Sequence, residues 1–420
     1  MKYIFTSLQQ KQRGLTLIEL LIAMFLGTLL ILGATSMFIA NKRVYKEVDF
    51  QGRLAENARF GMEMMIRDLR MAGFRGCAVN QNVDNNLNIK LTSGTHKDKQ
   101  DPKQLLSFVA NSSSECASQG ITADACMQSN SIEGREAGTS EWEPSGSTEP
   151  TDITIDNASD AFTVRFMEDT NTNLCKDMTQ TNSDAEADNQ TSSVLIPAGL
   201  FVEGGIFAAA DCEATNIFQL TKEAPGAAGK GPFVLEHAAG GDFTPGNEVA
   251  TLSKIYTAGT SSCAASPVDI FVFRARRYFV ATDSTIVGED NIEIPALYRQ
   301  TFEINASTDG ATKPEVFSER LIDGVENMQI LYGEDTSGDR VADAYKKADD
   351  DTIVWANVVS VKLAVLFANV EQDFSGPLDT KSDYRLLDAP DFDPTPGAND
   401  HRRRKIVEAT VSLRNRQLSL

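Results

Sequence analysis

The sequence predicts an α+β protein in which one long N-terminal helix packs on an antiparallel β-sheet with large inserted loops. Three patterns support this prediction. Residues 15–40 form an almost uninterrupted apolar run, residues 41–72 repeat apolar side chains every three or four positions, and several segments after residue 266 alternate apolar and polar side chains. The first two patterns indicate a helix, and the third is typical of strands with one buried face.

The apolar run at residues 15–40 is long enough to cross a membrane. As a helix with a rise of about 1.5 Å per residue it spans about 39 Å. It holds one charged side chain, Glu19, and the basic residues 1–14 precede it. We expect that leader to stay in the cytoplasm. An ordinary secretory signal peptide fits less well, because the run is too long and no small-residue cleavage site follows it.

Residues 13–20 read Arg-Gly-Leu-Thr-Leu-Ile-Glu-Leu. They resemble the class III signal of type IV prepilins and pseudopilins, in which a short basic leader ends in glycine and the fifth residue of the apolar run is glutamate. The resemblance implies that prepilin peptidase cuts between Gly14 and Leu15, and that Leu15 becomes the N-methylated terminus. Phenylalanine is more usual in the family at the position of Leu15.

Glu19 needs a partner, because an acid at the centre of a membrane helix is unfavourable by about 2.5–3.5 kcal/mol and by less near the interface. After cleavage, Glu19 of one subunit can pair with the free amine of Leu15 in a neighbouring subunit whose helix is staggered against it. Such a pair is stronger in a low dielectric than in water. We therefore expect Glu19 to act in assembly.

The patterns divide the chain into five parts. They are a cleaved leader, a transmembrane and filament-core helix, an amphipathic helix of the globular domain, a region of strands and inserted loops, and a C-terminal antiparallel sheet region. The expected boundaries are 1–14, 15–40, 41–76, 77–265 and 266–420.

Segments in both halves of the chain resemble the PilW family of minor pilins: 67–77, 211–221, 324–333 with 355–366, and 402–416. The resemblance implies a minor type IV pilin that takes part in pilus initiation and tip structure and supports adhesion or motility. It would sit in the inner membrane by a single pass with a periplasmic C-terminal domain, and then in the extracellular pilus. Its partners would be other minor and major pilins, prepilin peptidase and a large tip adhesin. The alternatives are a J-type minor pseudopilin of type II secretion and an anchored extracytoplasmic adhesin.

The composition and motifs argue against two other classes. A formal net charge of -20 repels nucleic acid, so we expect no nucleic-acid partner. Neither a Gly-x-Ser-x-Gly elbow nor a His-Glu-x-x-His motif occurs, and residues 224–232 lack the spacing of a phosphate loop. We therefore expect no enzyme activity.

Six cysteines are predicted to be mostly oxidised, because an even number in an exported domain favours disulfides over buried thiols. No pair has the Cys-x-x-Cys spacing of a zinc site. Cys116 and Cys126 are the closest in sequence and the first choice for a local pair, and the full connectivity stays open. The six are Cys77, Cys116, Cys126, Cys175, Cys212 and Cys263.

Residues 335–343 have the spacing of an EF-hand-type loop and predict a possible calcium site. The oxygen ligands would be Asp335, Ser337, Asp339, the Val341 carbonyl and Asp343. Two departures weaken the pattern, since Arg340 stands where the turn usually has glycine and Lys346 replaces the bidentate glutamate. The alternative is a polar hairpin whose aspartates and glycine serve the turn geometry.

Overall fold

The structure is a computed structural model, and the description below covers the parts of the chain whose placement is defined. These residues are 16–74, 76, 83–85, 131–138, 153–156, 158–178, 186–188, 203–221, 233–239, 246–247, 252, 254–257, 266–288, 293–306, 312–372, 378–381, 383–387, 389, 392 and 400–415. Gly14, Leu15, Cys77, Cys116, Cys126 and Cys263 lie outside them.

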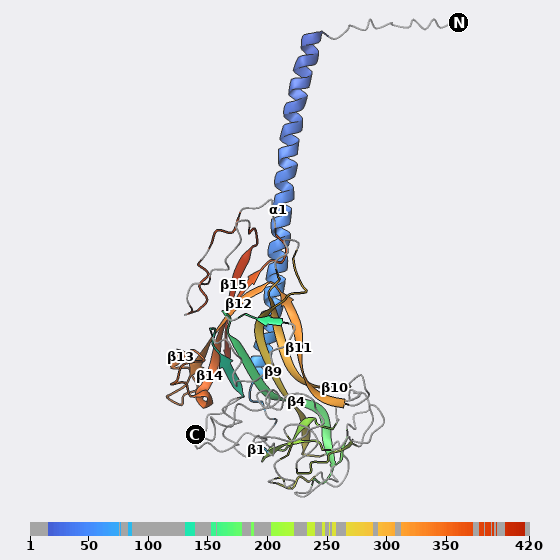
Figure 1. Cartoon of the computed structure of the whole chain (residues 1–420), viewed down its shortest axis with the longest axis vertical. Helices are drawn as coiled ribbons and strands as arrows, with labels where there is room; N and C mark the ends of the chain where they lie inside the picture. Colours follow the sequence, from blue (N-terminus) through green and yellow to red (C-terminus); the bar gives the residue numbers. More distant parts are fainter. Residues whose placement is uncertain are drawn as a thin grey trace, which may run out of the picture.

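One long helix and two sheets make up this part of the chain (Figure 1). The elements are α1 (Leu17–Met71), β1 (Val83–Asn85), β2 (Ile132–Arg135), β3 (Ile153–Ile155), β4 (Ala161–Lys176), β5 (Glu186–Asp188), β6 (Ile206–Ala210), β7 (Thr215–Gln219), β8 (Phe233–Val234), β9 (Asp269–Asp283), β10 (Ala296–Ala306), β11 (Thr312–Asp323), β12 (Val325–Glu334), β13 (Ala344–Lys346), the 3-10 helix η2 (Trp355–Asn357), β14 (Val358–Ala368) and β15 (Arg404–Ser412). The α+β prediction is confirmed.

Helix α1 is continuous from the apolar run into the globular head. Its N-terminal half extends away from the sheets, while its C-terminal half lies against them (Figure 1). The buried side of that half begins at Phe50 and continues through Leu54, Met62 and Leu69 at helical spacing. Just beyond the last turn, Gly73 has a φ of +76°, a left-handed conformation that glycine adopts without strain.

The described strands form two sheets. A four-stranded antiparallel sheet has the order β13-β12-β14-β15. The larger sheet has eleven described strands, and its path runs β1-β7-β6-β9-β4-β5-β8, with β2, β3, β10 and β11 paired at its sides. Among the described strands of this sheet, all pairings are antiparallel except the parallel pair of β1 and β7.

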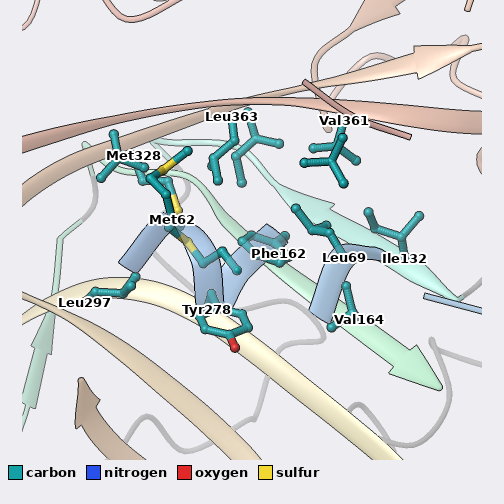
Figure 2. Packing of buried hydrophobic residues seen from close by; sticks show 14 of the residues in the cluster. Met62, Leu69, Ile132, Phe162, Val164, Tyr278, Leu297, Met328, Val361 and Leu363 are labelled. Atoms are coloured by element: carbon teal, nitrogen blue, oxygen red, sulfur yellow. The ribbon is translucent and has the colours of Figure 1, made fainter. Parts of the chain in front are cut away.

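The main hydrophobic core joins α1 to both sheets (Figure 2). Met62 and Leu69 of α1 pack with Leu363 of β14, on the side of the four-stranded sheet. Phe162 of β4 and Tyr278 of β9 belong to the same core and stack with their ring centroids 5.1 Å apart. The helix is therefore a structural part of the head, and not a tether attached to it.

The register of β14 differs from the sequence prediction at its start. The alternating pattern places Val359 with Val361 and Leu363 on the buried face. The structure has an irregularity at Gly333/Glu334, opposite this end of β14, and Val358 instead joins the core with Val361. The sequence of residues 407–413 alternates apolar and polar side chains and predicts a strand with one buried face. The structure confirms this for β15, because Val407, Ala409, Val411 and Leu413 pack on the core while Glu408, Thr410 and Ser412 are exposed.

Candidate assembly site

Glu19 lies in the first turn of α1, where it takes part in a capping box with Thr16. The Thr16 hydroxyl accepts a hydrogen bond from the Glu19 backbone N–H at 3.4 Å, and the Glu19 carboxylate accepts one from the Thr16 backbone N–H at 3.4 Å. Two N–H groups that a helix start leaves unpaired are thereby satisfied. The carboxylate is held at the tip of the helix, beside Thr16.

Between Glu19 and the head, α1 is an exposed apolar stem. This stretch contains an 18-residue window with a mean hydropathy of 2.4, and none of that window is buried in the molecule. Its length and composition are sufficient to cross a membrane. Leu17, Phe25 and Leu30 illustrate the exposure, since more than half of each side chain is open to solvent. Such a surface requires either lipid or the helices of other subunits around it.

Asp68 fixes the C-terminal half of α1 to strand β9. Its side chain is 1% exposed, although the residue belongs to an amphipathic helix. It accepts hydrogen bonds from the Arg276 guanidinium at 2.8 Å and from the Tyr278 hydroxyl at 2.5 Å. Burial, followed by the charge of Asp68, raises the pKa of Tyr278, so the phenol stays a donor at all physiological pH values. We call Asp68, Arg276 and Tyr278 the helix clamp.

A second charge cluster closes the connection between β14 and β15. Arg404 has a side chain that is 1% exposed and donates to Glu326 at 2.6 and 2.9 Å, to Asp379 at 2.6 Å and to Asp400 at 2.6 Å. Burial alone would raise the pKa of Asp379, but the hydrogen bonds from Arg404, Lys381 and Tyr384 hold it below its usual value. The cluster attaches Asp379 and Asp400 of this long connection to the four-stranded sheet.

The predicted calcium loop forms a turn whose carboxylates contact their own backbone. Asp335 accepts hydrogen bonds from the N–H groups of Gly338 and Arg340, each at 2.6 Å, and Asp343 accepts one from Thr336 at 2.7 Å. Burial alone would raise the pKa of Asp335, but these bonds hold it below the usual value, and the bonds from Thr336 likewise lower the pKa of Asp343. In the part of the chain that the structure describes, no group of three His, Cys, Asp or Glu side chains is arranged to hold a metal ion. The calcium site stays a prediction.

Cys212, on the exposed turn between β6 and β7, is disulfide-bonded, and its partner is not among the described side chains. No cysteine in the described part of the chain is free. The local pair Cys116–Cys126 and the rest of the connectivity stay predictions.

Sequence reasoning found Glu19 but missed the helix clamp and the Arg404 cluster. One signal for the clamp was present, because Asp68 lies three residues after Met65 and directly before Leu69, on the apolar face of the helix. An acid on that face predicts a buried partner. Nothing in the sequence identifies Arg276 as that partner, since the two residues are 208 positions apart.

Two family models match the chain. The prokaryotic N-terminal methylation motif matches residues 9–35, and the model described as Type IV Pilus-assembly protein W matches residues 277–415. The first covers Gly14, Leu15 and Glu19, and the second begins within β9 and extends through β15. No curated protein and no solved structure matches the chain.

A methylation motif on a long helix, with antiparallel sheets behind it, makes the chain similar to type IV pilus-related pilins. Within that class the C-terminal match makes the chain PilW-like, as the sequence resemblance predicts. These families are structural and not enzymatic.

Proposed function

We propose that this chain is a minor type IV pilin, inserted in the inner membrane with its head in the periplasm and later built into the extracellular pilus at or near its tip. The observation that supports the proposal best is the stem of α1. It is apolar and fully exposed, it starts at Glu19, and it continues without a break into the core of the head. A subunit of this form is buried along its stem only when other helices surround it.

In this proposal Glu19 acts as the docking group. Its carboxylate already lies at the tip of the helix, within a capping box whose bonds are 3.3–3.4 Å long. A neighbouring subunit that brings the methylated amine of its Leu15 to this carboxylate replaces those long hydrogen bonds with a pair of opposite charges. The surrounding apolar helices make the pair strong, and they make an unpaired Glu19 unfavourable.

Mass spectrometry of the mature N-terminus from sheared surface filaments tests the proposal. We expect a chain that begins with methylated Leu15. Glu19→Ala is expected to insert and to be cut but to enter filaments poorly, whereas Glu56→Ala, a change of an exposed acid on the same helix, is the matched control. A bulky residue in place of Gly14 should leave an uncut precursor in the inner membrane. Normal incorporation of Glu19→Ala would refute the docking role.

The location of the mature chain separates the alternatives. Recovery from surface pili supports a role in the pilus, whereas recovery only with a short periplasmic assembly of a secretion system supports a J-type pseudopilin. In the pilus proposal, the partners of this chain are other minor and major pilins, prepilin peptidase and a large tip adhesin. A role in initiation is tested by counting pili on cells that lack this chain, and a role in adhesion by the binding of those cells after pilus number has been restored.

A further inference from the structure

A groove with a volume of about 790 Å³ runs between α1 and the start of strand β15. One wall is α1, and the other is β15, the edge strand of the four-stranded sheet. Its apolar lining includes Met62, Ile66 and Val407. Ile66 and Val407 are half-buried, so the groove is accessible to a partner along its length.

The rim of the groove is basic, although the whole protein is acidic. Arg59, Arg70 and Lys405 line it, all three are exposed, and none of them forms an ion pair with a residue that the structure describes. Arg67 adds a further cation. Glu63 is the one acidic side chain among the described residues that line the groove. A basic rim on a chain of net charge -20 attracts an anionic partner to this place and not to the rest of the surface.

The strand that forms one wall has a free edge. Among the described strands, β15 pairs with β14 and has no partner on its other side. An edge strand presents a row of unpaired N–H and C=O groups, and an extended peptide satisfies them by adding as a further strand. A strand of the length of β15, which covers Arg404–Ser412, offers about 30 Å for such pairing. An extended chain fits these groups, whereas a helix leaves them unpaired.

Other anionic partners fit less well. Arg59 lies nineteen residues beyond the end of the apolar run at residue 40, a distance of about 28 Å along the helix. Because electrostatic attraction is screened over about 8 Å at physiological salt, lipid headgroups at the membrane surface are out of reach. The overall negative charge opposes a nucleic acid, whose backbone would extend past the groove onto the acidic surface.

We propose that this groove binds an acidic, extended segment of a neighbouring pilus subunit, which adds to β15 as a further strand. Its apolar side chains enter the groove and its carboxylates meet Arg59, Arg70 and Lys405. That the partner is a pilus subunit rests on the proposed function, but the chemistry of the groove does not.

The binding test uses the full chain in detergent micelles and a fluorescein-labelled nine-residue peptide that alternates Asp and Val. Fluorescence anisotropy is expected to show saturable binding, corrected for micelles alone, that weakens as salt is raised. The triple change Arg59→Glu, Arg70→Glu and Lys405→Glu should weaken binding by about tenfold or more. The same variant should then bind a peptide that alternates Lys and Val.

The matched control makes the same change in net charge outside the groove, at Lys42→Glu, Arg43→Glu and Arg385→Glu, all of which are exposed. It should bind the acidic peptide within about twofold of the unaltered chain. A peptide with proline at alternate positions keeps the charge but cannot pair as a strand, and it should not bind. Equal loss in the control variant, equal binding of the proline peptide, or tighter binding of a single-stranded oligonucleotide than of the acidic peptide would overturn the proposal.

Crosslinking in cells identifies the partner. A photo-reactive residue at Val407, inside the groove, should crosslink to an acidic segment of another subunit, whereas one at Glu408, on the opposite face of β15, should not. If the chain enters filaments and Val407 gives no crosslink to a subunit, this inference fails while the proposed function stands. If the chain never enters filaments, the proposed function and the subunit partner fail together, and the peptide assay still decides the chemistry of the groove.

Discussion

Replacing Asp68 should destabilise the packing of α1 on the larger sheet, and it should lower the free energy of unfolding by more than the loss of an exposed helix residue does. In Asp68→Asn the charge that pairs with Arg276 at 2.8 Å is lost, while the amide oxygen keeps one of the two hydrogen bonds. A hydrogen bond to a charged group contributes about 1.5–3 kcal/mol. Asp68→Ala removes both bonds and leaves the Arg276 side chain, 16% exposed, without its carboxylate, so its cost should reach about 3–5 kcal/mol.

The measurement is urea unfolding of the full chain in micelles, followed by pulse proteolysis, which reports the fraction of folded head directly. Asp49→Asn is the control, because Asp49 lies on the same helix, is 44% exposed and pairs with Arg53 at 2.9 Å. Its loss should cost less than about 1 kcal/mol. If Asp68→Asn lowers the free energy of unfolding no more than Asp49→Asn does, the helix clamp contributes nothing and the reasoning is wrong.

Two further predictions concern charges in the head. Arg404→Met leaves three carboxylates without their buried cation and should lower the free energy of unfolding by about 3–5 kcal/mol. The control is Arg403→Met, whose side chain is 20% exposed and whose loss should cost less than about 1 kcal/mol. Equal losses in the two variants would contradict the prediction. Burial, together with the charge of Glu136, raises the pKa of Asp160 from 3.8 to about 7. The folded state therefore holds a proton that the unfolded state has lost, and the free energy of unfolding should fall by up to about 1.4 kcal/mol per unit as pH rises from 5 to 7. Urea titrations at pH 5 and pH 7 measure how the free energy of unfolding changes with pH. If Asp160→Asn shows the same change, groups other than Asp160 cause it.

The sequence predicted the elements that depend on local pattern. Helix α1 follows from an apolar run joined to a repeat of three and four, and β15 follows from the alternation of Val407, Ala409 and Val411 with polar residues. The antiparallel character of the C-terminal sheet likewise follows from the alternating pattern. For these features neighbouring residues in the sequence contain the necessary information.

The division into two sheets depends on contacts between distant residues and was not predicted. The predicted C-terminal sheet region, residues 266–420, places Val268 to Val280 together with β12, β14 and β15. In the structure β9 instead pairs with β4, β6 and β10, and β4 and β6 come from the region described as rich in inserted loops. Alternation shows that a strand has a buried face, but it does not specify the strand beside it. The same limit applies to Arg276, whose partner is 208 residues earlier in the chain.

Because α1 is a single helix from Leu17 to Met71, it also determines how the subunit transmits mechanical force. If the chain is built into a filament as proposed, tension pulls on the stem along the helix axis, and the head receives that load through the contacts from Phe50 to Leu69. These contacts and the helix clamp lie side by side along the direction of the pull, so they are loaded in shear and share the force. Strands peeled from a sheet edge would instead fail one bond at a time. In the proposed filament the head would therefore be held by contacts that share the load along α1.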